Sequence, residues 1–225
     1  MARSPGRPGA LTGGSDPVDF LRTAVRAGLD PILTLLRFRT FQERFHVEYA
    51  EQNPVSCKRG CSACCEQMVF DVAPVEVEDL GRHLRRTGRA EEVLARLRER
   101  RHRFDRIRLD HPRESGESDD AWVERVALEF WGEGLGCAFL DDEGACSVHE
   151  HRPQACRRFF VHGPPDLCNP VDAASDERRA RMVEPGSVDE VDSLLLAMSA
   201  QIAFDPEDDR LDHAMVRWLE NRSED

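Results

Sequence analysis

The chain has 225 residues, with 31 basic and 43 acidic side chains, and its formal net charge of −12 argues against a general nucleic-acid-binding protein. A hydrophobic content of 40% is enough for one well-packed domain. No segment approaches the roughly 20 apolar residues of a membrane-spanning helix, and the N-terminus lacks the apolar centre of a signal peptide. We therefore expect a cytoplasmic protein with no membrane partner.

The N-terminal part of the chain predicts a tail followed by helices. Residues 1–15 are rich in Gly, Pro and Ser and predict a disordered tail, which leaves 16–225 as a single mainly helical domain. Asp16-Pro17 and Asp30-Pro31 each place a capping carboxylate before a proline, which favours a helix start. The second predicted helix ends near Asn53-Pro54, and we interpret its aromatic stripe of Phe38, Phe41 and Phe45 as core packing.

Two further helices are predicted to form an αα-hairpin. One begins at Pro74 and ends at Gly88, and the other runs from about Ala90 to Leu109. Between Arg82 and Arg108 there are eleven arginines and four acids. We interpret this basic patch as a solvated helix surface, and the alternative is a docking site for an acidic protein partner or nucleic acid. Arg101 falls near the apolar stripe and is predicted to reach an internal carboxylate.

The remaining elements are a β-hairpin and three more helices. A polar loop at 111–120 precedes a short helix around 122–130, and the segments 137–140 and 145–148 predict two strands joined by a four-residue loop. Ser187 and Glu190 form a capping-box pattern, and Asp205-Pro206 predicts the start of the last helix. The predicted fold class is mainly α, with helices around an irregular cysteine-rich metal-binding core and one small β-hairpin.

Eight cysteines carry the strongest chemical signal of the sequence. The string CKRGCSACC holds Cys57, Cys61, Cys64 and Cys65, and a second set follows at Cys137, Cys146, Cys156 and Cys168. Short gaps between thiolates let a loop converge on one metal, and in a reducing compartment metal binding is favoured over disulfides. Eight thiolates can build two four-sulfur sites, or one cluster and a structural zinc.

Some cysteines leave alternatives open. Neighbouring side chains diverge, so either Cys64 or Cys65 serves a second metal, bridges two metals or stays free. Cys168 is equally consistent with a buried apolar cysteine. All eight are nevertheless predicted as metal ligands.

The string CxxxCxxCC at 57–65, followed by CAFLDDEGACSVHEHRPQACR at 137–157, resembles the YkgJ-like family of cysteine-cluster proteins, described as a putative zinc- or iron-chelating domain. The resemblance covers about residues 55–170 and implies bound zinc or iron, with a four-iron cluster (4Fe–4S) as one form. His149 stands where the family has tyrosine, and we do not expect it to be a ligand. Arg152 and Arg157 are predicted to offset the negative charge of the metal–thiolate centre, with ordinary ion pairs as the alternative.

Three functions are consistent with this pattern. The first is a metal-binding protein whose centre is structural or storage-like. The second is an iron–sulfur enzyme related by resemblance to flagellin lysine N-methylase, and the third is a zinc-stapled adaptor for an acidic partner. A radical S-adenosylmethionine enzyme is disfavoured, because the chain lacks the alternating strands and helices of a β/α barrel. No glycine-rich nucleotide loop is present, so the sequence leaves catalysis undecided.

Overall fold

The computed structural model describes residues 16–57, 60–162 and 180–222, and this part of the chain is mainly helical, as predicted. The predicted tail at 1–15 lies outside the described residues. The α-helices are α1 (Pro17–Arg26), α2 (Pro31–Gln52), α3 (Pro74–Arg86), α4 (Ala90–Asp110), α5 (Asp119–Gly132), α6 (Gln154–Arg157), α7 (Val188–Ser199) and α8 (Leu211–Asn221). A short 3₁₀ helix, η1 (His149–His151), precedes α6, and strands β1 (Phe159–Val161) and β2 (Ala180–Met182) follow it.

The helix starts follow the capping chemistry of the sequence. The Asp16 carboxylate accepts the Val18 amide at 2.8 Å, and the Asp30 carboxylate accepts the Leu33 amide at 2.8 Å. The Ser187 hydroxyl caps α7 by accepting the Glu190 amide at 3.2 Å. The Glu190 carboxylate does not complete the predicted capping box. It binds Arg22 of α1 instead and so connects α7 to α1.

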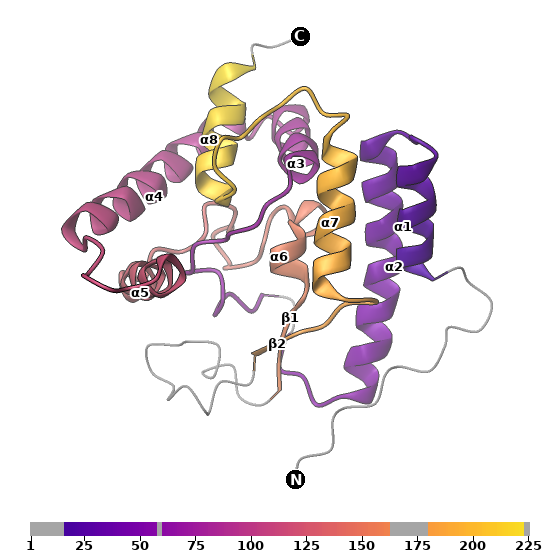
Figure 1. Ribbon diagram of the computed structural model, residues 1–225, viewed down its shortest axis with the longest axis horizontal. Helices are drawn as coiled ribbons and strands as arrows, with labels where there is room; N and C mark the ends of the chain where they lie inside the picture. Colours follow the sequence, from indigo (N-terminus) through magenta and orange to yellow (C-terminus); the bar gives the residue numbers. More distant parts are fainter. Residues whose placement is uncertain (1–15, 58–59, 163–179, 223–225) are drawn as a thin grey trace.

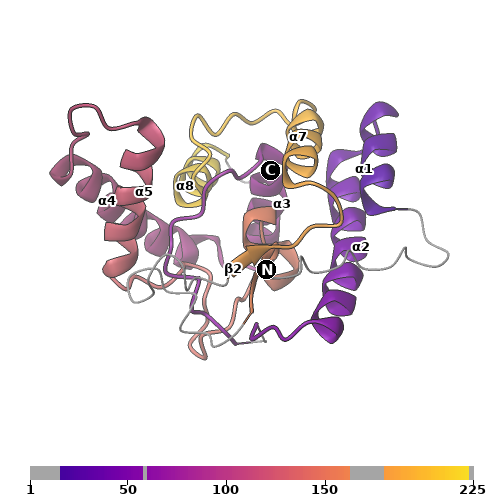
Figure 2. The same ribbon diagram turned by 60° about the horizontal axis from the view of Figure 1, so that its bottom comes forward.

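Two groups of helices enclose the cysteine-bearing segments. Figure 1 shows α4, α5 and α8 on one side and α1, α2 and α7 on the other, and α6 lies between them in both Figure 1 and Figure 2. One apolar cluster joins α3, α4 and α8, and it includes the partly buried Cys137 and Cys146. A second cluster joins α1, α2 and α7 to the start of α3. Helix α3 therefore belongs to both halves of the core.

The crossing of α3 and α8 depends on a glycine. A Cβ atom on Gly81 would lie 2.3 Å from the Trp218 ring, so only glycine allows this approach. The Trp218 indole N–H donates to the buried Glu78 carboxylate at 2.8 Å, and Glu78 also accepts from Arg82 and Arg222 at 2.8 Å each. Packing and charge thus fix α8 against α3 at one place.

Gly81→Ala should lower the free energy of unfolding by about 1–3 kcal/mol, because the added methyl group forces Trp218 away from α3. Urea unfolding followed by circular dichroism measures this change. Gly132→Ala is the matched control, since nothing lies within 4 Å of its Cβ position in α5. Equal stability of the Gly81→Ala protein and the wild type would contradict the close crossing.

Three sequence predictions need correction. The hairpin expected over 137–140 and 145–148 reduces to one antiparallel bridge between Leu140 and Cys146, because the Asp141 carboxylate accepts the amides of Glu143 and Ala145 and folds the connection into a tight turn. The strand pair lies instead at β1 and β2, where Phe159 is opposite Met182.

The last helix begins at Leu211 and not at Asp205-Pro206. Glu207 has a φ of 58°. The carbonyl of Asp209 and the amide of Leu211 form hydrogen bonds with residues 69–72, so this segment lies alongside residues 69–72 before α8 begins.

The buried arginine of α4 is Arg100 and not Arg101. Its guanidinium binds Asp212 of α8 at 2.9 Å and the Gln67 carbonyl at 3.1 Å.

Candidate metal centre

The first cysteine segment is fixed by its contacts with β1. Val55 forms an isolated antiparallel bridge with His162, and the Ser56 amide donates to the Val161 carbonyl at 2.9 Å. The Cys57 sulfur accepts the Val161 amide at 3.4 Å. Cysteine sulfur is a weak acceptor, and this bond from a backbone amide orients Cys57 without using a side-chain partner.

Cys61, Cys64 and Cys65, the other three cysteines of this segment, lie in a turn next to the second cysteine segment. Gly60 has a φ of 82°, a left-handed conformation that glycine adopts without strain. The Cys65 amide donates to the Ser62 carbonyl at 2.8 Å, which closes a turn around Cys64. Gly144 of the second cysteine segment lies against this turn, with its Cβ position 3.9 Å from the Ser62 hydroxyl. The two segments are therefore neighbours in space.

Cysteines from three parts of the chain influence one another's ionisation. A hydrogen bond with Cys64 and burial raise the pKa of Cys65, and the nearby Cys137 and Cys156 raise it further. The same hydrogen bond lowers the pKa of Cys64 to about 7. Burial raises the pKa of Cys156, and Cys137, Cys64 and Cys146 add to that effect. The fold thus gathers thiols that are up to about 90 residues apart in sequence.

All seven cysteines within the described ranges are free thiols, and Cys168 lies outside those ranges. In the same ranges no group of three or more His, Cys, Asp or Glu side chains is arranged to hold a metal ion. Burial raises the pKa of Cys137 to about 12, so this thiol keeps its proton at neutral pH in the absence of a cation. The structure therefore gathers the thiols without closing them around a metal.

Arg152 is the cation that the cysteines share. Burial raises the pKa of Cys57, Cys146 and Cys156, and the charge of Arg152 opposes that rise; the same charge adds to the hydrogen bond with Cys65 that lowers the pKa of Cys64. The Arg152 Nε is buried and has no hydrogen-bond partner among the described residues. A buried guanidinium nitrogen without an acceptor is costly, and an anionic group at the cysteines would offset that cost.

The Arg157 side chain binds mainly backbone carbonyls. Its guanidinium donates to the carbonyls of Arg152 at 2.9 Å and His149 at 3.0 Å, which ties η1 to α6. Burial lowers the pKa of Arg157 to about 10, and the neighbouring Arg39 and Arg152 add repulsion. His149 is exposed, whereas His151 is only 12% exposed and binds Asp79 at 2.8 Å. His151 is therefore held against α3 by this contact.

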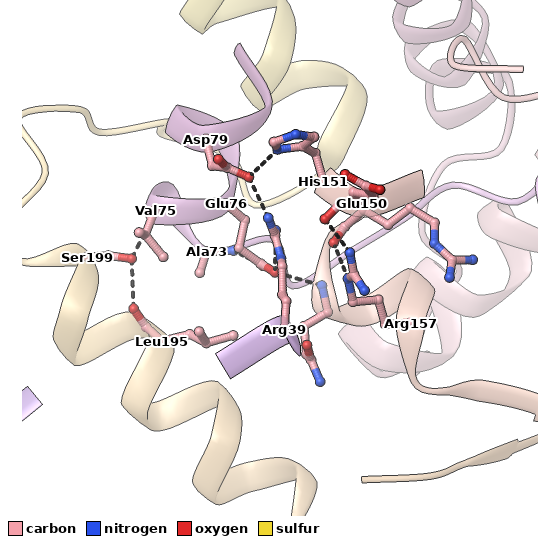
Figure 3. A network of polar contacts seen from close by, with 12 residues as sticks. Arg39, Ala73, Val75, Glu76, Asp79, Glu150, His151, Arg157, Leu195 and Ser199 are labelled. Atoms are coloured by element: carbon pink, nitrogen blue, oxygen red, sulfur yellow. Dashed lines mark hydrogen bonds and ion pairs between the residues drawn. The ribbon is translucent and has the colours of Figure 1, made fainter. Parts of the chain in front are cut away.

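Figure 3 shows a buried ionic network between α2, α3 and α6 that the sequence did not reveal. Arg39 of α2 binds Asp79 and lies 3.7 Å from Glu76. The Glu76 carboxylate accepts the Gln154 amide at 2.6 Å and the Ala73 amide at 3.2 Å. Burial raises the pKa of Glu76, and the charge of Arg39 opposes that rise. The network fixes the first residue of α6, two positions before Cys156.

Arg39→Met should lower the free energy of unfolding by about 3–5 kcal/mol, because it leaves the buried Glu76 and Asp79 carboxylates without their cation. Urea unfolding at pH 7 measures the effect. Arg98→Met is the control, since its ion pair with Glu220 is exposed and contributes less than about 1 kcal/mol. Equal losses in the two variants would show that the Arg39 network does not stabilise the fold.

Glu184 adds a second buried contact to α6. Its carboxylate accepts hydrogen bonds from the side chains of Gln154 and Gln42. Burial raises the pKa of Glu184 to about 7, and the two amides and Arg158 oppose that rise. The protonated form is therefore favoured in the folded protein over part of the physiological pH range.

The raised pKa of Glu184 predicts a pH dependence of stability. Between its ordinary pKa of 4.5 and about 7, the folded protein keeps a proton that the unfolded chain releases. The free energy of unfolding should therefore fall as the pH rises through this interval. Glu184→Gln should be up to about 3 kcal/mol more stable relative to the wild type at pH 8 than at pH 4.5.

Urea unfolding of both proteins at the two pH values measures this difference. Glu124→Gln is the control, because Glu124 is an exposed carboxylate of α5. Parallel stability profiles of the wild type and Glu184→Gln would contradict the assignment of this titration to Glu184.

Comparison with known families identifies the cysteine-bearing region. Residues 56–180, more than half of the chain, match the family model CxxCxxCC, described as a putative zinc- or iron-chelating domain. The chain belongs to this family. Its first gap, between Cys57 and Cys61, has three residues where the CxxCxxCC name has two. No curated protein and no solved structure matched the chain.

The CxxCxxCC match covers every predicted ligand, from Cys57 to Cys168. None of the helices in the part of the chain that the structure describes is long and apolar enough to cross a membrane. The family's chelating description supports metal binding as the common property of these cysteines. Which of them act as ligands stays a prediction.

Proposed function

We propose that this protein chelates zinc or iron through Cys57, Cys61, Cys64, Cys65, Cys137, Cys146 and Cys156, with Cys168 as an eighth ligand. The observation that carries the proposal is the gathering of thiols from three distant segments around Arg152. Free thiols at such short spacing in a reducing compartment, such as the cytoplasm, are typical metal ligands. The YkgJ-like resemblance of the cysteine pattern is part of this proposal.

The charges around the cysteines suit a metal–thiolate centre. Four thiolates on Zn²⁺ leave a net charge of −2, and a four-iron cluster is also anionic. Arg152 supplies a positive charge and an Nε–H that has no acceptor among the residues the structure describes, and Arg157 binds the backbone carbonyl of Arg152. These two arginines would stabilise the bound centre and orient its ligands.

Zinc and iron would give the same protein different chemistry. Zinc would contribute folding free energy alone, because its binding requires the folded arrangement of the thiols. An iron–sulfur cluster would add an electron carrier, and it belongs to the alternative of an enzyme related to flagellin lysine N-methylase. The donor set is all sulfur among the proposed ligands, and it suits both metals.

The adaptor alternative has less support. Eight of the eleven arginines between Arg82 and Arg108 already form ion pairs within the described structure, so little of the basic patch is free for an acidic partner. The acids that pair with them come from α3, α4 and α8 and from Glu133, which directly follows α5. A protein partner at the hairpin stays a prediction from the sequence.

Replacing Cys61 or Cys146 with serine should lower both the bound metal and the melting temperature, because ligation free energy is folding free energy in such sites. Metal analysis and a visible absorption spectrum of anaerobically purified protein measure the first effect, and calorimetry measures the second. Iron with acid-labile sulfide and visible absorption identifies a cluster, and a colourless protein with zinc identifies a structural site.

Ser62→Ala is the matched control, because Ser62 lies in the same turn and has no sulfur. Its metal content should equal that of the wild type. Wild-type metal content in both cysteine variants would contradict the proposal.

A further inference from the structure

A cavity of about 930 Å³ lies away from the cysteines, between α4, α5, the end of α7 and the segment 205–210. No cysteine lines it. Its size is that of a pocket for a small organic molecule. Two exposed apolar side chains, Val123 and Leu196, stand at its edge with 38% and 61% of their surface exposed. Neither the metal proposal nor the family match explains this cavity.

The floor of the cavity is apolar and aromatic. Phe70, Val72, Phe104, Trp122 and Val126 form it. The guanidinium groups of Arg108 and Arg210 lie 5.2 Å from the Trp122 ring and 5.0 Å from the Phe104 ring. Both aromatic rings therefore already accept cations, which is the electrostatic preference of their π faces.

The segment 205–210 adds four carboxylates to the cavity wall, and two of them, Asp208 and Glu207, form ion pairs. Asp208 binds Arg210 at 2.8 Å, Glu207 binds Arg217 at 2.5 Å and Asp205 accepts the Glu207 amide at 2.9 Å. Asp209 has no ion-pair partner in the described part of the chain, although its carbonyl ties the segment to the floor by accepting the Val72 amide at 3.0 Å.

The surroundings of Asp209 are short of positive charge. Burial raises the pKa of Asp209, the neighbouring carboxylates of Asp71 and Asp208 raise it further, and its backbone amide and the charge of Arg210 only partly oppose that rise. A bound cation would relieve this repulsion. The other cationic lining residue, Arg108, is half exposed, and its guanidinium lies over the Trp122 ring and 4.0 Å from Asp105.

We propose that this cavity binds an amphiphilic amine, whose aromatic or alkyl body packs on Trp122 and Val126 and whose ammonium group pairs with Asp209. The apolar floor excludes a simple inorganic ion as the occupant, because such an ion gains nothing from apolar contact. The unpaired carboxylate favours a cation over a neutral molecule or an anion of the same shape.

Three matched probes test the proposal: 4-phenylbutylamine, 4-phenyl-1-butanol and 4-phenylbutyrate. Titration of the metal-loaded full chain, followed by two-dimensional NMR of the three tryptophan indole N–H signals, reports binding at the site. The Trp122 signal should shift, because this ring lines the cavity, while the buried Trp218 signal stays in place. The amine should bind about fivefold more tightly than the alcohol, and the carboxylate most weakly.

Two exposed positions allow variants that should not disturb folding. Asp209→Asn should remove the preference for the amine, and Leu196→Arg should weaken amine binding by placing a positive charge at the cavity edge. Glu124→Gln, on α5 outside the cavity, should change neither. Absence of binding by all three probes, tighter binding of the carboxylate, or an unchanged preference in Asp209→Asn would each overturn the proposal.

Discussion

The buried carboxylate of Glu76 links the helical frame to the cysteines. It accepts the amide of Ala73 at the start of α3 and the amide of Gln154 at the start of α6, two residues that are far apart in the sequence. A carboxylate this deeply buried is tolerated because Arg39 and two amides compensate its charge. Since α3 packs in both halves of the core, the position of Cys156 follows from the packing of the whole molecule.

The proposed ligands rest on three different supports. Cys57 is held by the amide of Val161, Cys137 and Cys146 pack against the α3–α4–α8 cluster, and Cys156 belongs to α6. The first two supports are made by residues outside the cysteine motif, whereas α6 is the last part of the motif itself. Contacts other than metal–thiolate bonds therefore position these four cysteines.

The sequence predicted those features that depend on local chemistry. The Asp-Pro starts of α1 and α2, the bounds of α3 and α4 and the mainly helical class all follow from capping and apolar periodicity. The predicted start of α8 was wrong, because segment 205–210 forms backbone hydrogen bonds with residues 69–72 and does not form the first turn of the helix. No sequence pattern identified Arg39, Asp79 or Glu184 as members of the buried ionic network, because the network depends on tertiary pairing that residue spacing does not encode. For Glu76 such a pattern exists, since a glutamate three residues after the helix boundary at Ala73 is typical of a capping interaction.

The central claim is that cysteines from separate segments share one metal centre. X-ray absorption at the metal edge of the protein as purified anaerobically tests it most directly, because it reports the type and distance of the ligand atoms. The account predicts a first shell of sulfur at about 2.3 Å around zinc or iron. A first shell dominated by oxygen or nitrogen would contradict it, because the thiols gathered around Arg152 would then not be the ligands.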